Sequence, residues 1–384
     1  TLPIAGSTLI STIDIDLQTY GEELMQNKIG AIVAIEPSTG EILSLVSAPT
    51  YNPNLLIGRK RSDNYKILSE DENKPLFNRA LQGTYPPGST FKLINGLIAL
   101  QEKSVNKNKL FSCDGDNGYS YGRDRHLGCH PHQNPIGLEK GVEISCNAYF
   151  CHLYDSYFNQ FESTISAYDN WHNHVASFGI GNYMNNDFTT GSTGKLPKSS
   201  YFEKLYRGSW NANTIISMAI GQGELLLTPI QMANMTAIIA NRGFYYTPHI
   251  IKEISEQESI DTNFTKKKYC SIEQKHFTPI INGMQKVIEG KDGTAQNSKI
   301  PDLEICGKTG TAQNPHGEDH SIFIAFAPKD NPKIAIAVYV ENGGFGSTWA
   351  APIASLMIDK YMNKSINNTN MEEFILNGNL ISEK

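Results

Sequence analysis

The chain has 384 residues, of which 39% are hydrophobic and 19% are charged, and its formal net charge is -6. This composition is typical of a globular protein and excludes a disordered one. The length suffices for one large catalytic domain with a sizeable core. No dense run of Lys or Arg is present, so a nucleic-acid partner is not expected. No run of about 18–20 apolar residues is present, so no segment of the sequence is predicted to span a bilayer.

The opening residues, Thr1-Leu2-Pro3-Ile4, contain neither a Met nor a signal-peptide pattern. We therefore expect the chain to be part of a longer protein.

The first predicted elements are a helix and a hairpin. An alternating run at residues 9–15 precedes a short helix at residues 17–26. Apolar runs at residues 30–36 and 41–47 flank Pro37-Ser38-Thr39-Gly40, a sequence that favours a hairpin turn. This pair predicts two strands of a sheet.

A surface excursion and a buried helix follow. Residues 48–79 are rich in Asn, Pro and charge, which is typical of an exposed segment. Pro86-Pro87-Gly88 ends it, and apolar residues then recur with helical spacing through residues 89–100. The pattern predicts a buried helix that begins at Ser89.

The second half of the chain predicts helices and strands in an α+β arrangement. Helices are expected at residues 145–157, 162–178, 228–241 and 349–362, and strands at residues 303–313, 321–328 and 333–340. We expect an antiparallel sheet with helices on both faces. A near-repeat, residues 293–296 against 310–313 (both Gly-Thr-Ala-Gln), is interpreted as turn chemistry and not as duplication.

A candidate nucleophile lies at the start of the predicted helix. Ser89 and Lys92 stand three residues apart, so their side chains share one face. A serine hydroxyl needs a base to remove its proton, and a lysine that burial keeps neutral can serve. The S-x-x-K spacing alone is weak, because Ser104 with Lys107 and Ser192 with Lys195 match it too. Ser89 alone would be an ordinary helix cap.

Two further motifs make the pattern specific. Ser145-Cys146-Asn147 is an S-x-N triplet at a predicted helix start, and Lys308-Thr309-Gly310-Thr311 carries the single K-T-G of the chain on a predicted strand. S-x-N triplets occur elsewhere, but only this one lies between Ser89 and the K-T-G on a predicted helix start. The three motifs occur in the order of the penicilloyl-serine transferases.

The sequence resembles the class B penicillin-binding proteins over nearly its whole length. The similarity extends to Thr12-Ile13-Asp14, residues 30–49, 85–92 and 307–328, and Ala219-Ile220-Gly221-Gln222-Gly223. Within the family it is most similar to the elongation-type group, penicillin-binding protein 2. The resemblance implies the penicilloyl-serine transferase fold with an all-helical subregion, and one transpeptidase domain at residues 1–384.

The resemblance also implies a role for each motif residue. Ser89 would be acylated and Lys92 would be its base, while Ser145 relays the proton and Asn147 bonds Lys92 and the substrate. The terminal carboxylate would be held by Lys308 with Thr309 and Thr311, beside Gly310. The backbone N–H groups of Ser89 and Thr311 would form the oxyanion hole.

A metal site is predicted in the segment of residues 110–136, which lacks periodic structure. Cys113, Cys129, His132 and Cys146 form a set of zinc-ligand types, with Cys129 and His132 at short-pair spacing. His130 is a neighbouring or substitute ligand. Some members of the elongation-type group resemble this pattern, with ligands before the triplet and a cysteine inside it. A disulfide between Cys113 and Cys129 is the alternative.

The resemblance implies a peptidoglycan D,D-transpeptidase that cross-links stem peptides ending in D-Ala-D-Ala, is inhibited by β-lactams, acts in cell elongation, and needs no catalytic cofactor. Alternatives are a D,D-carboxypeptidase or β-lactamase and, from another class, a non-catalytic β-lactam-sensing receptor. Implied partners are a membrane glycosyltransferase and elongation-complex scaffold proteins. The expected location is the periplasmic face of the bacterial inner membrane, with a membrane helix and a pedestal domain upstream of this chain.

Overall fold

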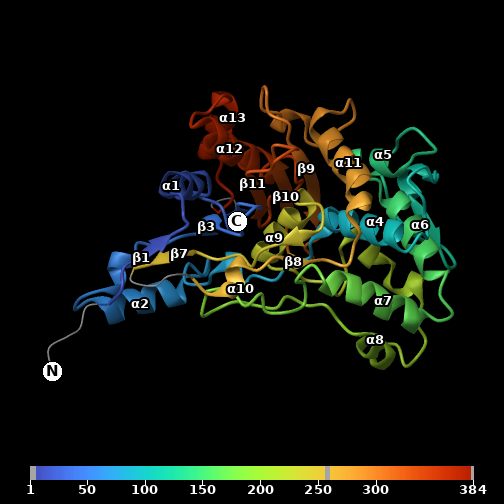
Figure 1. Ribbon diagram of the computed structural model, residues 1–384, viewed down its shortest axis with the longest axis horizontal. Helices are drawn as coiled ribbons and strands as arrows, with labels where there is room; N and C mark the ends of the chain where they lie inside the picture. Colours follow the sequence, from blue (N-terminus) through green and yellow to red (C-terminus); the bar gives the residue numbers. More distant parts are fainter. Residues whose placement is uncertain (1–5, 256–259, 382–384) are drawn as a thin grey trace.

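A five-stranded antiparallel sheet forms the centre of the computed structural model, which describes residues 6–255 and 260–381 (Figure 1). The opening residues 1–5 lie outside the described part. The strand order is β3-β2-β11-β10-β9. The strands are β2 (Gly30–Ile35), β3 (Ile42–Ala48), β9 (Cys306–Ala312), β10 (His320–Ala327) and β11 (Ile334–Val340). The predicted hairpin and the three predicted C-terminal strands are thereby confirmed.

Helices cover both faces of this sheet, as predicted. Every residue of β2 and β11 is buried, which requires cover on two sides. Helix α12 (Ala350–Asn363) packs on β10 and β11 and against α1 (Ile15–Leu24), which lies on β3. Helix α9 (Pro229–Ala240) packs on β2, β10 and β11 and is buried at every residue. The core therefore continues from the sheet through α9.

An all-helical subregion lies beside the sheet, on the right in Figure 1. It contains α4 (Lys92–Gln101), α5 (Leu138–Glu143), α6 (Asn147–Phe158), α7 (Thr164–Ala176), α8 (Ser199–Leu205) and the 3-10 segment η4 (Ala212–Ile220). Helix α11 (Phe277–Glu289) packs against α5 and β9 and so joins the subregion to the sheet. Among residues 6–255 and 260–381, no helix combines the length and the apolar character needed to cross a bilayer.

Smaller elements complete the described chain. They are β1 (Leu9–Ser11), η1 (Pro53–Leu56), α2 (Arg61–Glu70), α3 (Arg79–Gln82), η2 (Gly88–Phe91), η3 (Gly115–Asn117), β4 (Tyr119–Tyr121), β5 (Arg125–Leu127), β6 (Phe244–Tyr245), β7 (Ile251–Ile254), α10 (Thr262–Thr265), β8 (Lys268–Tyr269), η5 (Gln274–His276), η6 (Gln296–Ser298) and α13 (Thr369–Asn377). Helix α2 has no buried residue, in keeping with the predicted surface excursion.

Two predicted helix starts were wrong. The helix predicted from Ser89 begins as the 3-10 turn η2 and becomes α-helical only at Lys92. The helix predicted from Ser145 begins at Asn147 with Cys146 as its N-cap. Ser145 itself has a φ of +57°, a left-handed conformation that a non-glycine residue adopts at a cost. Tertiary contacts at the site, described below, account for both differences.

Asn95 ties the helical subregion together from within α4. Its side-chain oxygen accepts a hydrogen bond from the indole N–H of Trp171 in α7 at 2.8 Å. Its amide donates to the carbonyl oxygens of Met218 (3.1 Å) and Ala219 (3.0 Å) in η4. Asn95 and Trp171 are buried, so these bonds cannot be replaced by water.

The Asn95→Leu substitution is expected to lower the free energy of unfolding by about 3 kcal/mol, because it leaves the buried Trp171 N–H without its acceptor and removes the amide donor to the Met218 and Ala219 carbonyl oxygens. Equilibrium denaturation would measure the change. The control is Asn159→Leu at the exposed end of α6, which should cost less than about 1 kcal/mol. Equal effects of the two substitutions would contradict the role given to Asn95.

Candidate active site

Ser89 is held at the floor of a cleft by close backbone contacts. The preceding Gly88 has a φ of +54°, and a Cβ there would lie 2.7 Å from the carbonyl oxygen of Thr311. The Gly88 N–H donates to the carbonyl of Gly221 at 2.9 Å. A Cβ on Gly221, whose φ is +71°, would lie 2.2 Å from the Gly88 oxygen. Only glycines permit this approach, which explains why glycine stands at both Gly88 and Gly221.

Lys92 lies beneath the cleft, and its side chain is bonded to the second motif. Its Nζ donates to the carbonyl oxygen of Ser145 at 2.7 Å and to Asn147 Oδ1 at 2.6 Å. Ser145 Oγ lies 3.2 Å from the same nitrogen. A neutral amine has two protons and one lone pair, so it can donate the first two bonds and accept the third from the Ser145 hydroxyl. The structure thus brings Lys92, Ser145 and Asn147 together as predicted.

Burial sets the protonation of both lysines. Burial lowers the pKa of Lys92 to about 8, against an opposing effect of the nearby Cys146 and Cys129. Burial, followed by repulsion from Lys92, holds the pKa of Lys308 well below its ordinary value. A lowered pKa means that the neutral amine, which is the basic form, is available near neutral pH.

The third motif forms one wall of the cleft. Residues Thr309, Gly310 and Thr311 of β9 line the cleft, which has a volume of about 440 Å³, together with Ser89. Lys308 is fully buried behind them, and its Nζ donates to the Thr309 carbonyl at 3.0 Å. The predicted residues of the three motifs therefore surround one cleft, with Lys92 and Lys308 underneath it.

The structure adds lining residues that the sequence motifs did not indicate. Gln222 donates through Nε2 to the Thr311 carbonyl at 3.1 Å and so fixes the end of β9. Thr294 bonds Thr309 through their hydroxyls. Phe345 and Gly346, from the loop before α12, form another part of the rim. Gln222 lies in the Gly221-Gln222-Gly223 sequence and Thr294 in the near-repeat, and the sequence could have indicated both. Phe345 lies in no motif or periodic pattern.

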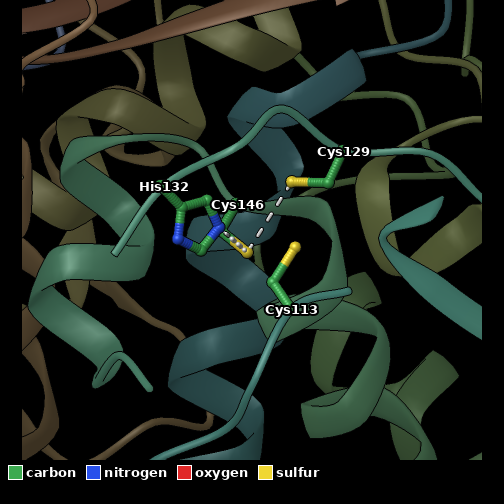
Figure 2. A group of neighbouring side chains, drawn as sticks. All are labelled: Cys113, Cys129, His132 and Cys146. Atoms are coloured by element: carbon green, nitrogen blue, oxygen red, sulfur yellow. Dashed lines mark hydrogen bonds between the residues drawn. The ribbon is translucent and has the colours of Figure 1, made fainter. Parts of the chain in front are cut away.

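The four predicted metal ligands converge (Figure 2). The Sγ atoms of Cys113, Cys129 and Cys146 and a ring nitrogen of His132 all lie within 4.8 Å of one another. Cys129 Sγ lies 3.8 Å from Cys146 Sγ, and His132 Nε2 lies 3.1 Å from Cys146 Sγ. His132 Nδ1 lies 2.9 Å from the Gln133 carbonyl, which leaves Nε2 as the ligand atom.

The cluster is linked to the second motif through the backbone. The N–H of Asn147 donates to Cys129 Sγ at 3.3 Å, and the N–H of Tyr149 donates to Cys146 Sγ at 3.3 Å. Hydrogen bonding from Cys146 lowers the pKa of Cys129, and the same bond together with burial raises the pKa of Cys146, so the pair shares one proton. His130 lies outside the four-residue cluster and lines the cleft instead.

The cysteines in the structure are free thiols, including Cys113 and Cys129. The alternative disulfide between these two is therefore not formed here.

A family profile described as "Penicillin binding protein transpeptidase domain" matches residues 30–359. The chain belongs to this family. The peptidoglycan D,D-transpeptidase MrdA of Acinetobacter baumannii is 31% identical to it, an alignment that covers 94% of this chain and 54% of the relative. The chain spans about half the length of the curated relatives that it matches first.

Solved structures of penicillin-binding proteins are similar to this chain in fold. Penicillin-binding protein 2 of Pseudomonas aeruginosa, in complex with WCK 5153, has a TM-score of 0.83 at 34% identity and covers 94% of this chain and 80% of its own. Penicillin-binding protein 2 in the complex with MreC from Helicobacter pylori has a TM-score of 0.79 at 27% identity, and the alignment covers 92% of this chain and 64% of that chain. An imipenem acyl-enzyme complex of penicillin-binding protein A from M. tuberculosis has a TM-score of 0.76 at 28% sequence identity, and the alignment covers 93% of this chain and 80% of that protein. The predicted fold class and resemblance to the penicillin-binding protein 2 group are confirmed.

Proposed function

We propose that this penicillin-binding transpeptidase domain is a peptidoglycan D,D-transpeptidase that cross-links stem peptides through an acyl-enzyme on Ser89. The observation that carries the proposal is the convergence of all three motifs on one cleft, with the Lys92 amine bonded to Ser145 and Asn147. The imipenem acyl-enzyme of the M. tuberculosis relative supports the same chemistry.

The first half of the reaction is acylation. Ser89 Oγ attacks the carbonyl of the penultimate D-Ala while Lys92 Nζ takes the hydroxyl proton. The backbone N–H groups of Ser89 and Thr311 stabilise the oxyanion. Collapse breaks the peptide C–N bond, and the proton passes from Lys92 through Ser145 Oγ to the departing amine. D-Ala leaves, and the acyl group stays on Ser89.

The second half is the transfer. The amine of another stem peptide attacks the acyl carbonyl, gives a proton back along the same route, and releases Ser89. Before D-Ala leaves, the hydroxyls of Thr309 and Thr311 bind the terminal carboxylate of the donor, and the amine of buried Lys308 donates to the Thr309 carbonyl behind them. Water as acceptor would instead give a D,D-carboxypeptidase or a β-lactamase.

Intact-mass spectrometry after incubation with benzylpenicillin tests the nucleophile. We expect one stable adduct on the native chain and none on Ser89→Ala, because Ser89 is the proposed nucleophile and lines the cleft with residues of the other two motifs. The matched control is Ser192→Ala, which removes the serine of another S-x-x-K pair and should retain the adduct. An adduct that persists in Ser89→Ala would contradict the proposal.

The same measurement separates the competing functions. Rapid turnover of the adduct to penicilloate would indicate a β-lactamase. A stable adduct without transfer of a D-Ala-D-Ala peptide to any amine acceptor would indicate a receptor.

We further propose that Cys113, Cys129, His132 and Cys146 hold a structural zinc ion. Tetrahedral zinc with bonds of about 2.3 Å to sulfur places two sulfurs about 3.8 Å apart, in agreement with the Cys129–Cys146 separation. Three thiols and one imidazole match a common structural zinc set. The ion would order residues 110–136 and, through the bond from Asn147 N–H to Cys129, steady the second motif.

Metal analysis of protein purified without chelator is expected to find about one equivalent of zinc. Cys113→Ser should lose most of it, whereas Cys151→Ser, a buried cysteine outside the cluster, should keep it. Removal of zinc should lower the melting temperature and slow the acylation of Ser89. Less than about a tenth of an equivalent in the native chain would overturn the site.

The remaining proposals concern the cellular setting. The similarity to penicillin-binding protein 2 bound to MreC supports a place in an elongation complex with scaffold proteins and a membrane glycosyltransferase. This setting implies the periplasmic face of the bacterial inner membrane, with the anchor and the pedestal domain supplied by a longer protein.

A further inference from the structure

Thr294 faces the third motif from a separate element. Its Oγ1 lies 2.7 Å from Oγ1 of Thr309, and both residues line the cleft. Thr309 belongs to β9, whereas Thr294 follows the end of α11. Thr294 is the second residue of the Gly-Thr-Ala-Gln near-repeat, which the reaction proposed above leaves without a role.

The backbone around Thr294 is fixed against the end of α11. Gly293 N–H donates to the Gly290 carbonyl at 3.1 Å, and Ala295 N–H donates to the Val287 carbonyl at 2.9 Å. A Cβ on Gly293 would lie 2.5 Å from the Val287 oxygen, so the turn closes tightly onto the helix. Ala295 is buried. Thr294 is thus held between two anchored neighbours, and its hydroxyl stays within reach of Thr309.

We propose that Thr294 is a positioning residue for recognition of the terminal carboxylate, acting through Thr309. This inference rests on the proposed function, in which Thr309 binds that carboxylate. A hydroxyl has one proton and can rotate freely when it has no partner. Either hydroxyl can donate in this bond. When a carboxylate is bound, Thr309 directs its own proton toward it, and Thr294 then acts as the donor to Thr309 Oγ1.

The arrangement also strengthens the bond to the substrate. A hydroxyl that accepts one hydrogen bond becomes a better donor in the next, particularly in a partly buried site. Thr309 is only 8% exposed, so water competes poorly for either bond. Thr294 should therefore favour acyl donors with a free carboxylate and give no advantage to donors in which that group is esterified.

The test compares benzylpenicillin with its methyl ester, which lacks the charged carboxylate. The second-order rate of Ser89 acylation would be measured for the native chain, Thr294→Val and Thr294→Ser. We expect Thr294→Val to lose about tenfold with benzylpenicillin and less than about twofold with the ester. Thr294→Ser keeps the hydroxyl and should stay within about threefold of the native rate.

Equal losses of acylation rate with the two compounds would show a merely structural role and would overturn the inference. An unchanged rate of Thr294→Val with benzylpenicillin would overturn it too. If Thr294→Val does not fold, Thr294→Ala removes the same hydroxyl and carries the same expectation. A native chain that forms no Ser89 adduct would refute the proposed function itself. A native chain that is acylated while Thr294→Val matches its rate would refute only the role of Thr294.

Discussion

The amino group of Lys92 is buried without a carboxylate partner, and the active site depends on that constraint. Burial penalises the charged form and lowers the pKa to about 8. A salt bridge would have reversed this effect and so removed the proposed base. The partners of the amine are instead a carbonyl, an amide oxygen and a hydroxyl, which accommodate the neutral form.

The geometry around this amine explains several features of the fold. Ser145 presents both its carbonyl and its hydroxyl to Lys92 from a left-handed backbone conformation, outside the helix that Asn147 begins. Asn147 also donates through Nδ2 to the Gly128 carbonyl at 2.7 Å, which joins the amine to the segment of the Cys/His cluster. The cluster is therefore linked to the Lys92 amine through the second motif.

The sequence predicted the fold best where neighbouring residues alone determine the element. The hairpin at residues 30–47 and the strands β10 and β11 follow from apolar runs and turn residues. The candidate ligands Cys113 and Cys146 were also found from residue type, although 33 positions separate them. Helix α11 was missed, although its buried apolar residues from Phe277 to Ile288 recur with helical spacing.

The rest of the site could not be predicted because it comes from tertiary contacts. Ser89 sits in a 3-10 turn since Gly88 must approach the Thr311 carbonyl, a constraint from a strand more than 200 residues away. Phe345 reaches the rim because the loop before α12 lies against β9 and β10, where the Phe345 carbonyl accepts from Ser321 Oγ at 2.8 Å and Gly346 approaches the Gly310 backbone. Such positions belong to no periodic pattern or motif, so their place at the site can be recognised only from the folded structure.

The most direct test of the central claim is the pH dependence of Ser89 acylation by benzylpenicillin between pH 6 and 10. Lys92 must be neutral to accept the serine proton, and its lowered pKa means that the neutral fraction grows through about pH 8. The account predicts a second-order rate that rises with pH through one ionisation near 8 and then reaches a plateau. A rate that is flat across this range, or that falls as Lys92 loses its proton, would contradict it.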